Sequence, residues 1–102
     1  MKAPGDCKNK DEIRNEIDRI DHEIIKLLGI RFQFVKEIVK YKLPDKDSIV
    51  AKNRYNQVIA ERRRLAEKNG LSPDTIEEMY KILIEYFINE EIKIINNNNN
   101  NK

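Results

Sequence analysis

The stretch DEIRNEIDRIDHEIIKLLGIRFQFVKEIVKYK, residues 11–42, decides the fold of this chain. Its apolar residues recur at spacings of three and four, which predicts one long amphipathic helix. They are Ile13, Ile17, Ile20, Ile24, Leu27, Leu28, Val35 and Ile38. Asp11 and Glu12 suit the positive end of the helix dipole, and Pro44 ends the helix because proline disfavours helix in the residue before it. Gly29 either allows a neighbouring helix to approach or is a tolerated defect.

A second helix is predicted after a short polar connection. The connection runs from Pro44 to about Ser48, and the helix continues to Lys68. Its apolar side carries Tyr55, Val58, Ile59, Leu65 and Ala66. Asn69 and Gly70 stop it, since both residue types tolerate the left-handed conformation of a helix C-cap.

The third helix begins at Ser72-Pro73-Asp74, which supplies an N-cap, a proline at the first helical position and an early acid. Its broad apolar face carries Ile76, Met79, Tyr80, Leu83, Ile84, Phe87, Ile88, Ile92 and Ile95. Six consecutive asparagines follow, and this composition has nothing to bury. We therefore expect one domain over residues 1–95 and a disordered Asn-rich tail over residues 96–102.

Composition excludes several classes of protein. The 20 Lys and Arg residues are nearly matched by 18 Asp and Glu, and the net charge of +2 does not favour binding to nucleic acid or an acidic membrane. Cys7 and His22 are each the only residue of their type, so the sequence predicts neither an intrachain disulfide nor a metal site. No apolar run resembles a signal peptide or a membrane span, and we expect a soluble cytoplasmic protein.

The length of the first helix predicts a homodimer. About 30 residues at 1.5 Å each give ~45 Å, whereas a compact domain of this size has a radius of gyration of ~13 Å. The helix therefore extends beyond its own domain while remaining amphipathic. A second copy of the chain is the simplest partner for the extra length.

Two cations flank an apolar strip on the first helix. Arg31, Val35, Ile38 and Lys42 follow the 4, 3, 4 spacing of one helical stripe, so the cations suit a small anion lying between them. Arg14 lies 17 residues before Arg31, about 26 Å away and about 100° around the helix, and only the Arg14 of a partner chain could share that ligand. A solvated surface role is the alternative for each cation.

Several segments resemble a known family. KAPGDC at residues 2–7 and IRNEIDRID at 13–21 resemble the small bacterial isochorismate pyruvate lyases of the α-helical chorismate mutase family. The resemblance continues through 61–67 and 69–71, and it covers residues 2–93. It implies three helices in an intertwined dimer that binds a dicarboxylate and eliminates pyruvate from isochorismate to give salicylate. The chemistry in this family is pericyclic and requires no cofactor or metal.

The resemblance also implies a role for particular residues. Arg14 would come from the neighbouring protomer, and Arg31 and Arg54 would bind the carboxylates of the substrate. Lys42 would contact a carboxylate and the ether oxygen. Guanidinium groups suit carboxylates because they donate two parallel hydrogen bonds. Glu91 stands where these enzymes have the glutamine that hydrogen-bonds the ether oxygen.

Two departures from the family pattern bear on function. An ionised Glu91 would repel the developing oxyanion, so it serves only if protonated, which burial favours. The alternatives are a surface glutamate paired with Lys93, or a misalignment with Glu90. Tyr55 follows Arg54 where mutases commonly place a glutamate, which favours the lyase. Chorismate mutase activity and a non-catalytic helical dimer remain the competing hypotheses.

Overall fold

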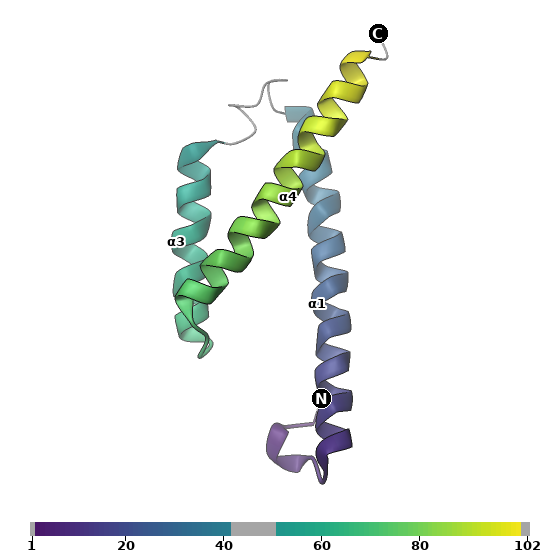
Figure 1. Ribbon diagram of the computed structural model, residues 1–102, viewed down its shortest axis with the longest axis vertical. Coiled ribbons are helices and arrows are strands. Elements are labelled where there is room, and N and C mark those ends of the chain that lie inside the picture. The colour runs from purple at the N-terminus through teal and green to yellow at the C-terminus, as the bar shows by residue number, and fades with distance from the viewer. Residues whose placement is uncertain (1, 42–50, 101–102) are drawn as a thin grey trace. The chain divides into compact units, whose positions relative to one another are not determined.

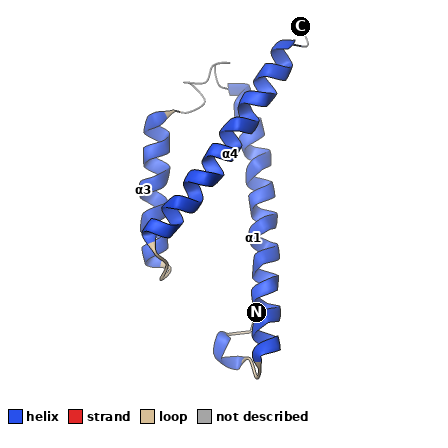
Figure 2. Cartoon of the chain, viewed as in Figure 1, coloured by secondary structure: helices blue, strands red, loops and turns tan. Residues whose placement is uncertain are grey.

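The computed structural model describes residues 2–41 and 51–100, and within these ranges it contains helices joined by turns and loops, with no strand (Figure 1, Figure 2). The elements in chain order are η1 (Pro4–Asp6), α1 (Lys10–Ile38), η2 (Val39–Tyr41), α3 (Lys52–Lys68) and α4 (Pro73–Asn100). The prediction of an all-α chain with three helices and a long first helix is confirmed. The chain divides into two units, residues 1–34 and 35–102, with the boundary inside α1.

An asparagine that the sequence analysis missed begins α1. The Glu12 amide donates to Asn9 Oδ1 at 2.9 Å, which makes Asn9 the N-cap. The Lys8 amide donates in turn to Glu12 Oε2 at 2.6 Å, and this hydrogen bond holds the pKa of Glu12 below its ordinary value. The helix therefore starts at Lys10, one residue earlier than the acids at 11 and 12 predicted.

The first unit has an exposed apolar stripe along α1. Its members repeat with the 4, 3 spacing of a coiled-coil seam, and Arg31 occupies one position of the same series. The apolar members are Ile13, Ile17, Ile20, Ile24, Leu27 and Phe34, which we call the α1 stripe. Their exposed fractions run from 39% at Ile20 to 72% at Phe34. No residue of α1 is buried, so this helix contributes no core residue of its own.

The end of α1 differs from the prediction of a helix reaching about Lys42. The α-helix ends at Ile38 and tightens into the 3-10 turn η2, a common way to finish a helix. Lys42 lies outside the described residues. So does the predicted connection to about Ser48, and α3 begins at Lys52.

The turn between α3 and α4 has the predicted helix-ending conformation. Gly70 adopts φ 75°, in the left-handed region. Its amide donates to Glu67 O at 3.2 Å, and the Leu71 amide donates to Ala66 O at 2.8 Å. This pair of bonds is a Schellman motif, and it satisfies two carbonyls at the C-terminus of α3.

The start of α4 is also as predicted, whereas its end is not. Ser72 Oγ accepts from the Thr75 amide at 3.2 Å, which confirms Ser72 as the N-cap. The helix runs to Asn100, five residues past Ile95, where disorder was expected. A helix that is already nucleated gains one hydrogen bond for each added residue, and this offsets the modest helix propensity of asparagine. The division at residue 95 into domain and tail stays a prediction.

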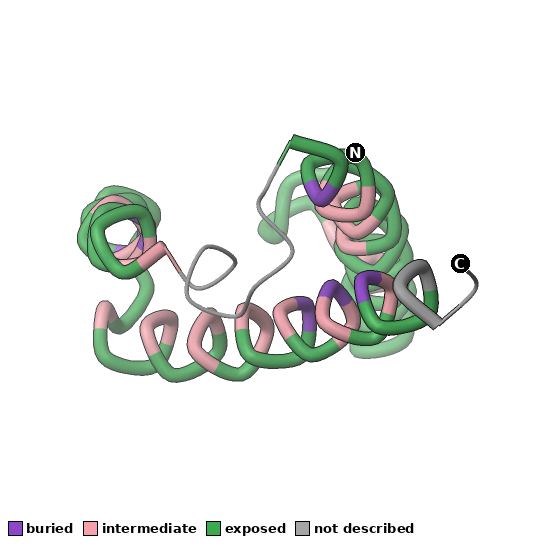
Figure 3. Tube along the Cα trace, turned by 90° about the horizontal axis from the view of Figure 1, so that it is seen from above, coloured by how far each residue is buried: buried purple, intermediate pink, exposed green. Residues whose placement is uncertain are grey.

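In the second unit α3 and α4 pack together beside their turn and diverge away from it (Figure 1, Figure 3). Val58 and Ala66 of α3 are buried. A further cluster joins η2 to the C-terminal part of α4 through Val39 and Ile95, with Ile88, Ile92 and Ile94 packed against them. None of the described helices is long and apolar enough to cross a membrane.

Two glycine substitutions test this description. We expect Gly70→Ala to lower the free energy of unfolding by about 1 kcal/mol, because alanine is strained at positive φ. Gly29→Ala is the matched control, since a Cβ there would meet nothing within 4 Å. Because alanine is a better helix former than glycine, we expect Gly29→Ala to raise the free energy of unfolding, measured in urea, by about 1 kcal/mol. An unchanged Gly70→Ala would contradict the turn, and a destabilised Gly29→Ala would mean that a second chain lies against residue 29.

Candidate functional site

Glu91 is a buried carboxyl on an otherwise apolar helix face. Its exposed fraction is 4%, and Phe87 and Ile95, four residues before and after it on α4, are buried as well. Burying an ionisable group is costly unless the group is paired, hydrogen-bonded or neutral. No buried side-chain nitrogen or oxygen in the described ranges lacks a hydrogen-bond partner, and Glu91 is among the residues with an interaction. A buried carboxyl of this kind is typical of a functional position.

The sequence left open that Glu91 is a surface residue paired with Lys93, but Glu90 forms that ion pair. Lys93 Nζ donates to Glu90 Oε1 at 3.1 Å, so Glu90 and not Glu91 forms the ion pair with Lys93. The interpretation of Glu91 as a surface glutamate paired with Lys93 is therefore wrong. Whether Glu91 contacts a substrate stays a prediction.

The first turn of α3 carries positive charge where a helix normally has acids. Lys52 and Arg54 lie in this turn, which contains no acid, whereas the first turns of α1 and α4 contain acidic residues. The helix dipole disfavours cations at this end and favours a bound anion. Arg54 is exposed and has no hydrogen bond or ion pair with any described residue. This end of α3 therefore suits an anionic ligand.

Arg14 and Arg31 both lie in the first unit, on the uninterrupted helix α1. Arg14 is exposed, and Arg31 is half-buried and has an interaction. Seventeen residues of α-helix separate them by about 26 Å along the axis and by about 100° around it. One small ligand cannot contact both side chains of the same α1.

The predicted site residues are divided between the two units. Arg54 and Glu91 lie in the second unit, on the parts of α3 and α4 that diverge beyond the turn (Figure 1). Lys42 falls outside the described residues. No group of three or more His, Cys, Asp or Glu side chains in the described part of the chain is arranged to hold a metal ion.

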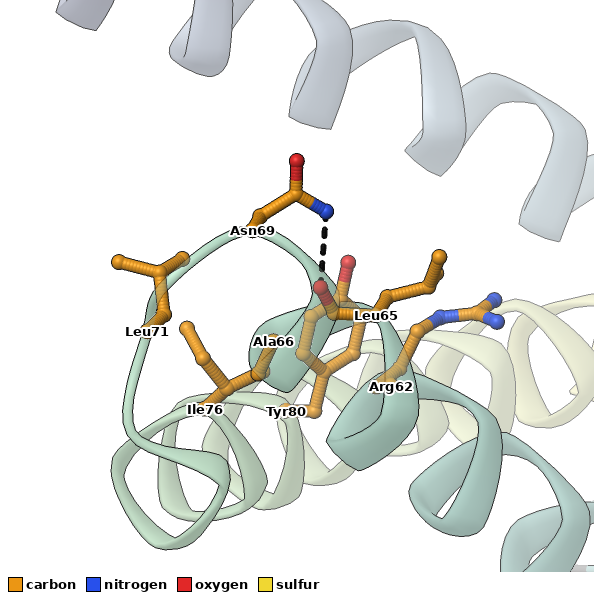
Figure 4. A pocket seen from close by; sticks show the side chains of 7 residues that line it. All are labelled: Arg62, Leu65, Ala66, Asn69, Leu71, Ile76 and Tyr80. Carbon is orange, nitrogen blue, oxygen red and sulfur yellow. Dashed lines mark hydrogen bonds between the residues drawn. The ribbon is translucent and has the colours of Figure 1, made fainter.

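A cavity that the sequence analysis missed lies beside the turn between α3 and α4 (Figure 4). Its volume is about 230 Å³. It is lined by Arg62, Leu65, Ala66, Asn69, Leu71, Ile76 and Tyr80, all in the second unit. Periodicity places several of these residues on apolar faces, but it carries no information on how closely two helices pack beside a turn. The cavity could not be predicted for that reason.

Arg63, the middle residue of the arginine run at 62–64, joins α3 to α4 through ion pairs. Arg63 Nη1 donates to Asp74 Oδ1 at 2.9 Å and to Glu77 Oε1 at 3.0 Å. Lys81 also binds Glu77, at 2.9 Å. The hydrogen bonds from Lys81 and then Arg63 hold the pKa of Glu77 below its ordinary value. Arg63 is thus committed to the packing of α3 on α4.

The flanking arginines have different surroundings. Arg64 pairs with Glu61 one turn earlier at 2.6 Å, and both side chains lie on the helix surface. Arg62 is half-buried, and its guanidinium lies over the Tyr80 ring, 5.6 Å from the ring centroid. It has no hydrogen bond or ion pair with a described residue. Arg62 is therefore a half-buried cation beside an apolar cavity, whereas Arg64 is exposed.

Residues 13–92 match the protein family described as "Chorismate mutase type II". The matched range begins in the first turn of α1 and extends almost to Ile95 on α4. It contains Arg14, Arg31, Arg54 and Glu91, which are the predicted site residues that the structure describes.

Individual relatives differ in how much of their length this chain spans. A protein of Pseudomonas aeruginosa named isochorismate pyruvate lyase is 39% identical over 93 residues, which are 91% of this chain and 91% of that protein. The T-protein of Haemophilus influenzae is 35% identical over 80 residues, 78% of this chain and 21% of that protein. A bifunctional chorismate mutase/prephenate dehydratase of Buchnera aphidicola is 29% identical over 90 residues, 86% of this chain and 23% of that protein. The chain thus spans nearly all of the first relative and about a fifth of the other two.

Proposed function

Because the chain belongs to the chorismate mutase type II family of pericyclic enzymes, which act on chorismate-type substrates, we propose that it is an isochorismate pyruvate lyase. The observation that carries the proposal is the similarity to a lyase over 91% of both chains. Tyr55 supports it, since the residue after Arg54 is commonly a glutamate in mutases. The reaction breaks the C–O ether bond and moves one ring hydrogen to the departing three-carbon unit, giving salicylate and pyruvate.

Arg31, Lys42 and Arg54 bind the two carboxylates of isochorismate in this proposal. Guanidinium groups hold a carboxylate in a fixed orientation through paired hydrogen bonds. Fixing both carboxylates restricts the substrate to its reactive conformer, and restriction of this kind lowers the barrier of a reaction that needs no nucleophile. The first turn of α3, which contains no acidic residue of its own, supports the role of Arg54, because its dipole and its cations favour the same anion.

A second copy of the chain supplies Arg14 in this proposal. The exposed α1 stripe favours a dimer, because six large apolar side chains on one helix gain by burial against another chain. The separation of Arg14 from Arg31 along α1 leads to the same arrangement, since a partner's helix can bring its own Arg14 to the ligand of Arg31. Each active site then contains residues of both chains.

Glu91 acts as a neutral hydrogen-bond donor to the ether oxygen. Its burial between Phe87 and Ile95 on α4 supports this role, because an apolar face favours the protonated form of a carboxyl. A protonated Glu91 would stabilise negative charge on the oxygen as the C–O bond breaks. An ionised Glu91 would oppose it.

Chorismate mutase activity is the second candidate, and the matches to the family and to the Buchnera bifunctional enzyme favour it. Both reactions start from breakage of the same kind of ether bond in closely related substrates. A single set of cations therefore suits either substrate. A non-catalytic helical dimer is the third reading, motivated by glutamate at position 91.

Purified protein tests the activity directly. We expect salicylate fluorescence to rise on addition of isochorismate, and kcat/KM for isochorismate to exceed that for chorismate. Arg31→Ala should lower kcat/KM by about 100-fold or more, because a charged contact to the substrate is lost. Arg19→Ala is the control, since Arg19 pairs with Glu16 on the same helix at 2.6 Å. Faster turnover of chorismate would favour the mutase, and failure to bind either substrate would favour the non-catalytic dimer.

The pH profile tests Glu91. The native enzyme should lose activity as rising pH ionises Glu91, whereas Glu91→Gln cannot ionise and should keep its activity to neutral pH. Glu90→Gln is the matched control, because Glu90 is paired with Lys93 and is not proposed to touch the substrate. If Glu91→Gln and Glu90→Gln show the same profile as the native enzyme, Glu91 does not act on the ether oxygen.

A further inference from the structure

We propose that Glu12 is a positioning residue for the shared active site. It binds the segment 2–9 to the first turn of α1, and this restraint holds Arg14 where the ligand of the other chain requires it. The inference rests on the proposed function, in which each chain supplies its Arg14 to the site of its partner. Glu12 itself touches no substrate atom and acts through the backbone that carries Arg14.

Arg14 lies in the part of α1 that most needs support. It is the fifth residue of the helix, which begins at Lys10. The Ile13 amide closes the first turn on Asn9 O at 3.3 Å, only one residue before Arg14. Helix ends fray, because their first amides have no partner within the helix. Fraying of this turn would displace the Arg14 side chain, so its position depends on contacts from outside the helix.

The carboxylate of Glu12 provides two such contacts. Its Oε2 accepts from the Lys8 amide at 2.6 Å, and its Oε1 lies 3.5 Å from Lys2 Nζ. The two oxygens thus bind both ends of residues 2–9, which we call the N-terminal hook and which turn back beside the start of α1 (Figure 1). The hook also contains the N-cap Asn9, whose Oδ1 accepts from the Glu12 amide at 2.9 Å.

The N-terminal hook is itself folded, so it can restrain the helix to which it is bound. The Asp6 amide donates to Ala3 O at 2.9 Å, and the Cys7 amide donates to Pro4 O at 3.3 Å. These bonds form the 3-10 turn η1, which begins at Pro4, a residue whose ring fixes φ. A segment that is already ordered loses less conformational entropy when both of its ends are bound.

The Arg14 side chain stays available for a ligand in this arrangement. Residues two apart on a helix do not face each other, so neither Glu12 nor Glu16 is placed to pair with Arg14. Glu16 pairs with Arg19 instead, at 2.6 Å. Arg14 is exposed and has no hydrogen bond or ion pair with any described residue. Glu12 thus supports the backbone at Arg14 and leaves its guanidinium for a carboxylate.

Three substitutions in the first turn of α1 test the role of the carboxylate. We expect Glu12→Ala to lower kcat/KM for isochorismate by about fivefold or more, because small misplacements of a binding group are costly in catalysis. Glu12→Gln keeps an acceptor oxygen for the Lys8 amide and should lose less. Asp11→Ala is the matched control and should leave kcat/KM unchanged. Asp11 is the other acid of this turn, and it has no hydrogen bond or ion pair with a described residue.

Mixed dimers distinguish positioning from a loss of stability. In a dimer of one Arg14→Ala chain and one Arg31→Ala chain, the single intact site takes its Arg14 from the Arg31→Ala chain. Glu12→Ala added to that donor chain should lower the activity of the mixture by about fivefold or more. Glu12→Ala added instead to the Arg14→Ala chain should leave it unchanged. Each mixed dimer contains one Glu12→Ala chain in both arrangements, so a loss of stability would affect both equally.

Hydrogen exchange gives a second measurement that does not depend on turnover. The amides of Ile13 and Arg14 should exchange about threefold faster or more in Glu12→Ala than in the native protein, because the first turn opens more often. Asp11→Ala should exchange at the native rate. Unchanged exchange in Glu12→Ala would overturn the inference.

The mixtures separate this inference from the proposed function. If the parent mixture of Arg14→Ala and Arg31→Ala is active, equal losses in the two Glu12→Ala arrangements, or no loss in either, would overturn the positioning role alone. An inactive native protein, or a parent mixture that recovers no activity, would overturn the proposed function and this inference with it. Circular dichroism melting of each variant confirms that the chains are folded before they are mixed.

Discussion

The exposed apolar stripe of α1 is the constraint on which the rest of the protein depends. No residue of this 29-residue helix is buried, although six large apolar side chains follow a coiled-coil spacing along it. Most helical stability comes from packing an amphipathic face and not from propensity, so α1 requires a partner surface. The same helix carries Arg14 and Arg31 too far apart for one small ligand. Burial of the α1 stripe and binding of one ligand by both Arg14 and Arg31 thus favour the same homodimer.

Two groups of charged residues, in the first turn of α3 and on the buried face of α4, lie at positions that do not favour the stability of the fold. The first turn of α3 holds Lys52 and Arg54 without an acid, and α4 buries Glu91 on an apolar face. Elsewhere the chain follows the ordinary rules, with acids in the first turns of α1 and α4 and with Arg63 paired across the α3–α4 contact. Local departures of this kind are typical of functional sites, because binding a ligand offsets their cost. The proposed anionic substrate, with Glu91 donating a hydrogen bond to its ether oxygen, would account for both departures.

Much of the fold could be predicted from local patterns, and the parts that could not be predicted depend on tertiary structure. Spacing of apolar residues placed the three helices, and Ser72 and Gly70 marked their caps through chemistry that acts within a few residues. The helical state of residues 96–100 was missed because composition does not include the cooperativity of a helix already formed. Among the site residues, burial of Glu91 was not predicted; the sequence analysis named it only as something that would favour a protonated Glu91. The cavity beside Arg62 was missed, because the distance between two helices at a turn is not encoded in either helix alone.

Mixing two inactive variants tests the shared active site most directly. Arg14→Ala and Arg31→Ala should each lose nearly all turnover of isochorismate. After the two proteins are unfolded together and refolded as an equal mixture, half of the dimers are mixed, and each mixed dimer contains one site with both arginines intact. We therefore expect the mixture to recover about a quarter of the native activity. A refolded mixture no more active than either variant alone would contradict a site built from two chains.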